Sequence, residues 1–358
     1  MTDIPTKMHG VVLTGHGGLD KLEWREDLET PTPEAGQALI KVGASSVNNT
    51  DINTRIAWYS KAVRGATSEG SDAGFGEDAL ADATWSGGTL AFPHIQGADC
   101  CGTIVALGQG VDPARLGQRV LVRALQSVPN EDGTHRVETF GSETNGAFAQ
   151  YAVVADKNAI AIKSDLSDTD LASFPCAFST AEGIIQRTGL GAERVLVTGA
   201  SGGVGSAAIQ LAKRRGAYVV AVSSASKAKA LRDLGADEVL DRADELPRNR
   251  FDVVIDLVGG PRWPELLETL VSGGRYATAG AIAGPIVELD LRTLYLRDLT
   301  LYGCTHQEDR VFTDLVKYIE KGEIRPLVAE VYDLRDLAKA QEAFVAKSHI
   351  GKIGILVR

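Results

Sequence analysis

A glycine-rich turn at residues 200–205 has the composition and spacing that bind a dinucleotide pyrophosphate. Its six residues are Ala200, Ser201, Gly202, Gly203, Val204 and Gly205, with alanine where the G-x-G-x-x-G pattern has its first glycine. Gly202 lets the backbone approach a pyrophosphate, and Gly205 lets the next helix pack closely on its strand. The free N–H groups of the first helical turn then face the anion. A structural tight turn without a ligand is the alternative.

The residues around this turn place it in the first half of a βαβ unit. Residues 195–197 form a short apolar run that is typical of a strand buried on both faces. Apolar residues then recur at helical spacing, and Gly216 follows the expected end of the helix. Residues 218–222 predict a second strand. This context makes the dinucleotide interpretation more specific than the motif alone.

The end of the second strand predicts which dinucleotide is bound. An NAD enzyme places an acid there for the ribose 2′-OH, whereas this chain has Ser223, Ser224 and then Lys227. An acid would repel a 2′-phosphate, but two hydroxyls and an ammonium attract it. We therefore predict NADP as the cofactor. The alternative for Lys227 is a solvated residue at the start of a helix.

Composition limits the classes of partner. The 358 residues are enough for two domains, and 44% hydrophobic and 23% charged residues are ordinary values for a globular protein. The formal net charge of -10 argues against nucleic acid and against an anionic membrane surface. The four cysteines lack C-x-x-C spacing, and we find neither a signal peptide nor a membrane-spanning run. We expect a cytoplasmic protein whose partner is a small molecule.

The rest of the chain predicts an α/β fold with two kinds of domain. Residues 8–154 contain short, partly alternating runs separated by glycine and proline, which favours a barrel or sandwich. From residue 194 onward strands alternate with helices, which favours a doubly wound parallel sheet. Residues 56–93 fit neither pattern, since Ala, Gly, Ser, Thr and Asp dominate around scattered aromatics. They are either a functional loop over a site or a solvated excursion.

Four motifs together resemble those of the medium-chain dehydrogenase/reductase superfamily. They are Gly-Ala-Ser-Gly-Gly-Val-Gly at 199–205, Ile-Gln-Gly-Ala-Asp-Cys-Cys-Gly at 95–102, Gly-Ala-Phe-Ala-Gln-Tyr at 146–151 and Gly-Lys-Ile at 351–353. The resemblance implies a GroES-like catalytic domain at 1–165 and 310–358, with the insertion at 56–93. It implies a Rossmann NADP-binding domain at 166–309, an active site in the cleft and a homodimer formed through the Rossmann domains.

The resemblance also predicts that the chain holds no metal. The zinc enzymes of the superfamily use a Cys, a His and a second Cys, and these positions fall on Asn48, Ala98 and Cys176. One thiolate cannot hold a catalytic zinc, which needs about three protein ligands. Asn48 followed by Asp51 is similar to the N-x-x-D stretch of the zinc-free, zeta-crystallin-like quinone oxidoreductases. Cys176 is then interpreted as a small buried apolar residue.

The resemblance implies roles for individual residues as well. Without zinc, hydrogen-bond donors must polarise a substrate carbonyl, and the candidates are Asn48, Thr50 and Tyr59. Lys227 matches the lysine that the zinc-free branch uses for the 2′-phosphate, and Arg242 falls where that branch has a tyrosine. The other cofactor-binding residues that the resemblance implies are Thr180, Val258, Gly280 and Lys352.

The predicted function is hydride transfer from NADPH to a quinone, an enone or a related α,β-unsaturated carbonyl compound, with the proton delivered by solvent. A zinc-type alcohol dehydrogenase with irregular ligands, using Asp99 or His94, is one alternative. A non-enzymatic NADPH-binding protein is the other.

Overall fold

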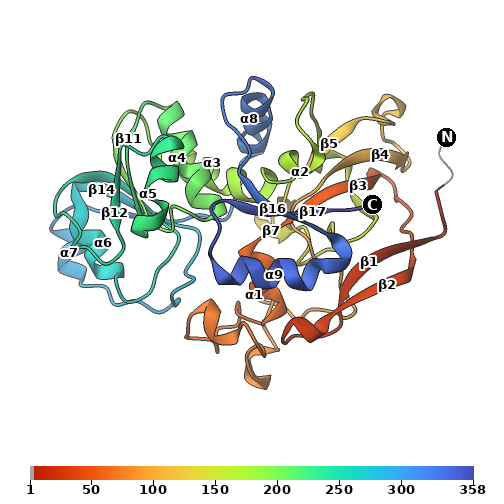
Figure 1. The fold of residues 1–358 in the computed structure, drawn as a ribbon, viewed down its shortest axis with the longest axis horizontal. Coiled ribbons are helices and arrows are strands. Elements are labelled where there is room, and N and C mark those ends of the chain that lie inside the picture. The colour runs from red at the N-terminus through yellow and green to blue at the C-terminus, as the bar shows by residue number, and fades with distance from the viewer. Residues whose placement is uncertain (1–3) are drawn as a thin grey trace. The chain divides into compact units, whose positions relative to one another are not determined.

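The computed structural model describes residues 4–358, which form two compact units (Figure 1). The first unit comprises the chain up to Val63, Gly70–Cys176 and Phe312–Arg358, and the second comprises Arg64–Glu69 and Ala177–Val311. The β-rich unit and the parallel-sheet unit predicted from the sequence are both confirmed by the strand order.

The first unit is built on a seven-stranded sheet in the order β16-β17-β3-β4-β5-β9, with β8 also paired to β3. Its strands are β16 (Val328–Asp333), β17 (Lys352–Leu356), β3 (Gln37–Val47), β4 (Cys101–Leu107), β5 (Arg119–Val122), β9 (Ala159–Ala161) and β8 (Tyr151–Ala155). Two further antiparallel pairs are β1 (Lys7–Leu13) with β2 (Leu22–Glu29), and β6 (Leu125–Pro129) with β7 (His135–Thr139). The pairing of β17 with β3 places the end of the chain beside Val47.

The helices of the first unit are α1 (Asn49–Arg55), α2 (Asp168–Leu171), α9 (Leu337–Ala346) and most of α8 (Asp309–Glu320). Because α2 packs on β3, β4 and β17, the first unit extends to Cys176. The domain boundaries expected after residues 165 and 309 therefore lie after Cys176 and Val311 in the structure.

The second unit is a six-stranded parallel sheet in the order β12-β11-β10-β13-β14-β15. The strands are β12 (Glu238–Asp241), β11 (Tyr218–Ser223), β10 (Arg194–Val197), β13 (Phe251–Asp256), β14 (Leu270–Thr278) and β15 (Thr300–Gly303), and the helices are α3 (Pro175–Thr188), α4 (Gly203–Arg214), α5 (Ala228–Asp233), α6 (Trp263–Thr269) and α7 (Leu291–Tyr295). The sheet begins with β10 in its middle. The chain then adds β11 and β12 on one side of β10 and β13, β14 and β15 on the other, so the strand order switches between β10 and β13. In such sheets ligands bind at the carboxyl ends of the strands at this switch point.

The insertion at 56–93 contains two short 3-10 turns, Thr67–Gly70 and Glu77–Ala79, and a small apolar core of its own. That core joins Ala57, Val63, Ala79 and Ala83, with Trp58 and Phe75 packed against it. Residues 64–69 group with the second unit, where the Thr67 N–H donates to the Ile282 carbonyl. Within residues 4–358, no helix combines the length and apolarity that crossing a bilayer requires.

Candidate active site

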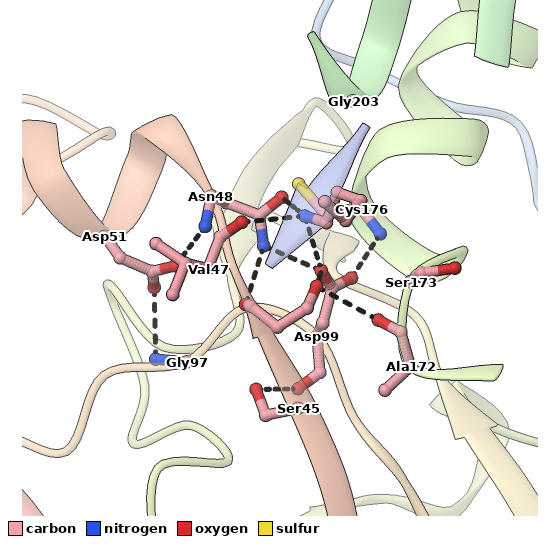
Figure 2. Close-up of polar contacts among 12 residues, drawn as sticks. Ser45, Val47, Asn48, Asp51, Gly97, Asp99, Ala172, Ser173, Cys176 and Gly203 are labelled. Atoms are coloured by element: carbon pink, nitrogen blue, oxygen red, sulfur yellow. Dashed lines mark hydrogen bonds and ion pairs between the residues drawn. The ribbon is translucent and has the colours of Figure 1, made fainter. Parts of the chain in front are cut away.

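The loop between β3 and α1 is fixed by the Asp51 carboxylate. Asp51 Oδ2 accepts the Asn48 N–H at 2.8 Å, and Oδ1 accepts the Gly97 N–H at 3.2 Å (Figure 2). The Asp51 carbonyl also accepts the Gln96 side-chain amide at 2.8 Å. These bonds tie the predicted N-x-x-D stretch to the 95–102 motif.

Asp51 is fully buried, and burial raises its pKa to about 7. The Asn48 N–H and the charge of Lys352 act in the opposite direction by stabilising the carboxylate, and they are weaker than the desolvation. Burial therefore shifts the pKa of this carboxyl, in the first turn of α1, toward neutrality.

Asp99 is the centre of a second set of contacts in the same unit. Its Oδ1 accepts the Cys176 N–H at 2.7 Å, and its Oδ2 accepts the Ser46 hydroxyl at 2.5 Å and the Asn48 amide at 2.7 Å (Figure 2). The Lys352 ammonium lies 3.0 Å from the same oxygen. Asp99 is 0% exposed, so this buried carboxylate is compensated by one cation and three hydrogen bonds.

Lys352 is also buried, with 2% of its side chain exposed. Its ammonium contacts three oxygens, those of the Val47 carbonyl at 3.0 Å, of the Asn48 side chain and of Asp99. An ammonium has three donors, and all three are directed at these groups. These three contacts lie inside the first unit, and the cofactor contact expected for Lys352 stays a prediction.

Asn48, predicted as a donor to the substrate, is held by hydrogen bonds on both sides of its side-chain amide. Its side-chain amide donates to the Ser46 carbonyl at 3.2 Å and to Asp99 at 2.7 Å, while Oδ1 accepts from Lys352. The opposite amide orientation would direct oxygen at a carboxylate and NH₂ at an ammonium, so the contacts themselves select this one. Both amide hydrogens are engaged within the first unit, so Asn48 links β3 to Asp99, and its predicted contact with a substrate stays a prediction.

Thr50 and Tyr59 remain as hydroxyl donors of the first unit. Thr50 lies in the first turn of α1, and its Oγ1 is buried without a hydrogen bond of good geometry in the described part of the chain. Tyr59 is half-buried as a residue, and its hydroxyl lies in buried surroundings close to the side chains of Thr50 and Asn53. Burial raises the Tyr59 pKa well above its usual value, so the phenol stays protonated. The structure thus brings these two predicted residues together.

In the second unit the glycine-rich turn has the geometry expected of a pyrophosphate site. Gly202 precedes α4 with extended backbone and no side-chain cap, so the first N–H groups of the helix are free of intrahelical partners. A Cβ on Gly205 would lie 2.3 Å from the Gly199 carbonyl oxygen, which explains the glycine by helix packing. A Cβ on Gly202 would make only an ordinary contact. A side chain at residue 202 would therefore not clash with the protein itself. The glycine is explained instead if a ligand lies against the backbone there.

The residues predicted to hold a 2′-phosphate gather at the ends of β11 and β12. Ser223 ends β11, and its carbonyl accepts the Arg242 N–H at 3.0 Å. Burial and then the charge of Arg242 lower the pKa of Lys227, so the two cations lie close to each other. A dianionic phosphate would relieve this repulsion. Ser224 begins the turn that carries Lys227.

Two acids near the cofactor residues were missed by the sequence analysis. Asp241 lies in register with Ser223, and its carboxylate accepts the N–H groups of Ala225 and Ala243, which lower its pKa. Buried Asp256 ends β13 and accepts the Thr198 and Tyr276 hydroxyls at 2.5 and 2.6 Å. The only sequence signal for either acid is its position at the carboxyl end of a strand.

Asp256 also shapes the loop that contains Val258. Its carboxylate accepts the Val258 N–H at 3.0 Å and the Gly259 N–H at 3.2 Å. Gly280 lies just beyond β14, where a Cβ would come within 3.2 Å of the Leu257 carbonyl. Thr180 is on α3 in the same unit. The structure places these residues but does not test their predicted contacts with a cofactor.

Comparisons with known proteins bear on the identity of the chain. Residues 34–164 match the alcohol dehydrogenase GroES-like domain, and residues 203–321 match the zinc-binding dehydrogenase family. An acryloyl-coenzyme A reductase from Sulfurisphaera tokodaii is 31% identical over 284 residues, which are 74% of this chain and 84% of the relative. The chain belongs to the medium-chain dehydrogenase/reductase superfamily. A quinone oxidoreductase from Lama guanicoe is 26% identical over 98% of both chains, which supports the quinone oxidoreductase-like branch.

Solved structures agree with this membership of an oxidoreductase superfamily. One from Sinorhizobium meliloti 1021, described as a candidate alcohol dehydrogenase, is 43% identical with a TM-score of 0.87 and covers 100% of this chain and 99% of its own. A thermostable alcohol dehydrogenase from Pyrobaculum aerophilum, solved with cobalt and zinc, is 31% identical with a TM-score of 0.81 and coverage of 98% and 99%. At least one similar superfamily member therefore binds metal. Whether this chain can do so depends on its own side chains at the corresponding positions.

The side chains that could hold a catalytic metal in this superfamily member were predicted to be too few. Residues 4–358 contain no group of three or more His, Cys, Asp or Glu side chains arranged to hold an ion. Burial raises the pKa of the Cys176 thiol. Asp99 is engaged with Lys352, and His94 is buried with a lowered pKa. Neither irregular ligand considered above joins a metal-binding cluster.

Proposed function

We propose that this superfamily member transfers hydride from NADPH to an α,β-unsaturated carbonyl compound or a quinone without a catalytic metal. The observation that carries the proposal is the contact of Lys352 with both Asn48 and Asp99. An ammonium supplies the buried positive charge next to the position where the zinc enzymes have their first cysteine ligand. An ammonium cannot act as a Lewis acid, so carbonyl polarisation has to come from hydrogen-bond donors.

The hydroxyls of Thr50 and Tyr59 are the proposed donors. Both belong to α1 and the residues just after it, and the Tyr59 hydroxyl is close to the Thr50 side chain. A protonated phenol and an alcohol can each donate to a carbonyl oxygen while negative charge develops on it. Asn48 and Asp51 hold the backbone that carries Thr50. Solvent supplies the proton that completes the reduction.

NADP is the proposed cofactor, and it supplies the hydride when bound. The first turn of α4 binds its pyrophosphate, and Ser223, Lys227 and Arg242 bind its 2′-phosphate. No acid stands at the end of β11, and the lowered Lys227 pKa beside Arg242 supports an anion between these two cations. Asp256 holds the Val258 loop at the carboxyl end of β13.

The substrate class is supported by the names of two relatives, an acryloyl-coenzyme A reductase and a quinone oxidoreductase. Acryloyl thioesters and quinones share a carbon–carbon double bond conjugated to a carbonyl. A hydride adds to such a system when the carbonyl oxygen is stabilised. The Thr50 and Tyr59 hydroxyls suit this chemistry.

We propose a homodimer as the assembled form. Six large apolar side chains are exposed between Ile286 and Leu296. Within residues 4–358, β15 lies at the edge of the parallel sheet and pairs with β14 on one side alone. Six exposed apolar side chains within eleven residues are typical of a surface covered by another chain. A second copy would cover both features of the second unit.

Turnover assays test the proposed reaction. The purified protein is mixed with NADPH and a panel of enones, enoyl thioesters and quinones, and the loss of NADPH is followed by absorbance. We expect turnover of at least one of these classes and no oxidation of simple alcohols with NADP. Alcohol oxidation without reduction of any conjugated carbonyl would support the zinc-type alternative instead. Tight NADPH binding without any turnover would support the non-enzymatic alternative.

A further inference from the structure

The indole of Trp85, in the insertion at 56–93, is held in place by the turn around it. Trp85 lies in a turn in which the Gly87 and Gly88 N–H groups donate to Thr84, at 3.0 Å to its carbonyl and 2.8 Å to its hydroxyl. The Thr84 N–H donates to the Gly88 carbonyl at 3.1 Å, which closes the turn. Ala83 and Thr84 are buried, so the turn is anchored in the small core of the insertion.

A carboxylate outside the insertion fastens the same turn. Glu143 Oε1 accepts the Ser86 N–H at 2.9 Å, and Oε2 accepts the Thr139 N–H at 2.8 Å. Thr139 is the last residue of β7 and is buried. Glu143 therefore links the residue that follows Trp85 to a strand end of the first unit.

The Trp85 ring packs on the ring of Tyr59. Their centroids are 4.9 Å apart with an interplanar angle of 63°, and the Trp58 ring contacts Tyr59 from another direction at 5.8 Å and 75°. Edge-to-face contacts in this distance range are favourable and orient the rings. The Tyr59 hydroxyl, at the far end of the same ring, lies close to Thr50 and Asn53.

We infer that Trp85 is a positioning residue that holds the Tyr59 hydroxyl beside Thr50, which makes the insertion part of the catalytic apparatus. The inference rests on the proposed function, because Tyr59 is one of the two donors proposed there. A phenol has two freely rotating side-chain bonds, and ring contacts restrict both. The insertion then acts through the geometry of Tyr59, and contact between Trp85 and the substrate is not required.

The test is a double-mutant cycle of Trp85→Ala and Tyr59→Phe, with steady-state kinetics on an enone and NADPH. We expect Trp85→Ala to lower kcat roughly two- to tenfold, the range of one aromatic contact, with the KM for NADPH unchanged. Trp85→Phe keeps a ring at the site and should restore most of kcat. In the Tyr59→Phe background, Trp85→Ala should have no further effect on kcat.

A matched control separates this role from general packing. Trp24→Ala removes an indole of the same unit that stacks on His9 at 5.1 Å, away from the insertion, and should leave kcat unchanged. An equal loss for Trp85→Ala with and without the Tyr59 hydroxyl would overturn the inference. So would an unchanged kcat in Trp85→Ala.

A second readout does not depend on finding a substrate. The same four proteins of the cycle are unfolded in urea, and their free energies of unfolding are compared. The comparison gives the coupling free energy between the Trp85 side chain and the Tyr59 hydroxyl. We expect a favourable coupling. No coupling would overturn the inference even if no substrate is turned over, whereas coupling without any turnover would contradict only the proposed function.

Discussion

The Lys352 ammonium lies 3.0 Å from the Asp99 carboxylate, and both side chains are buried. Lys352 begins β17, and Asp99 lies just before β4. The pair therefore joins the last strand of the chain to the loop that carries one of the sequence motifs. The Lys352–Asp99 pair also holds the side chains of Asn48 and Ser46 and the backbone N–H of Cys176 through hydrogen bonds.

Removing the cation should destabilise the protein strongly. Lys352→Met leaves Asp99 buried without a counter-charge, and breaking a buried pair in this way costs about 3–5 kcal/mol of unfolding free energy. Urea unfolding measures this cost. Lys339→Met is the control, because Lys339 is exposed on α9 and pairs with Asp336 at the surface. Equal stabilities of the Lys352→Met and Lys339→Met variants would show that the pair is not buried as described.

Cofactor choice should depend on Lys227. Losing a charge-assisted contact costs about 1.5–3 kcal/mol, so Lys227→Ala should weaken NADPH binding about ten- to a hundredfold and leave NADH nearly unchanged. Lys229→Ala removes an exposed lysine of α5 that pairs with Asp233, and it should not alter either affinity. Equal wild-type affinities for NADPH and NADH, measured by calorimetry, would contradict the assignment.

Stability should fall as the pH rises from about 4 to about 7 through Asp51. Burial raises the pKa of the folded carboxyl from 3.8 to about 7, so the folded state holds this proton more tightly than the unfolded chain does. The contribution is complete below about pH 4 and is lost as the pH passes the folded pKa. Asp51→Asn should remove this part of the pH dependence, as seen by urea unfolding across that range. A pH profile identical to that of the wild type would count against the shift.

The proposed homodimer should depend on the apolar side chains near α7. Leu291 and Leu296 are 64% and 67% exposed, and Leu291→Asp with Leu296→Asp should yield monomers of 37.9 kDa by light scattering. Leu116→Asp alters a residue of the first unit that is 50% exposed, and it should leave the dimer intact. A wild-type protein that is monomeric at all concentrations would refute the assembly.

Local patterns were enough to predict the second unit. The glycine-rich turn, the serine that ends β11 and the alternation of strands and helices all lie where expected. Each of these signals is read from residues close together in sequence, where backbone geometry and periodicity act directly.

Contacts between distant residues could not be predicted in the same way. The pairing of β17 with β3 brings the Lys352 ammonium to the Val47 carbonyl and to the side-chain oxygen of Asn48. No local pattern in the sequence predicts this contact between residues that are about 300 positions apart. The insertion was also beyond pattern analysis, because short 3-10 turns and a small alanine-rich core produce no periodicity.

The central claim, hydride transfer without a metal, is tested most directly by turnover before and after exhaustive chelation, with zinc quantified in the same samples. The buried Lys352 ammonium and the engaged side chains of Asn48 and Asp99 predict less than stoichiometric zinc and an unchanged rate of NADPH-dependent reduction. One zinc per chain, with activity that is lost on chelation and restored by adding zinc, would contradict the account.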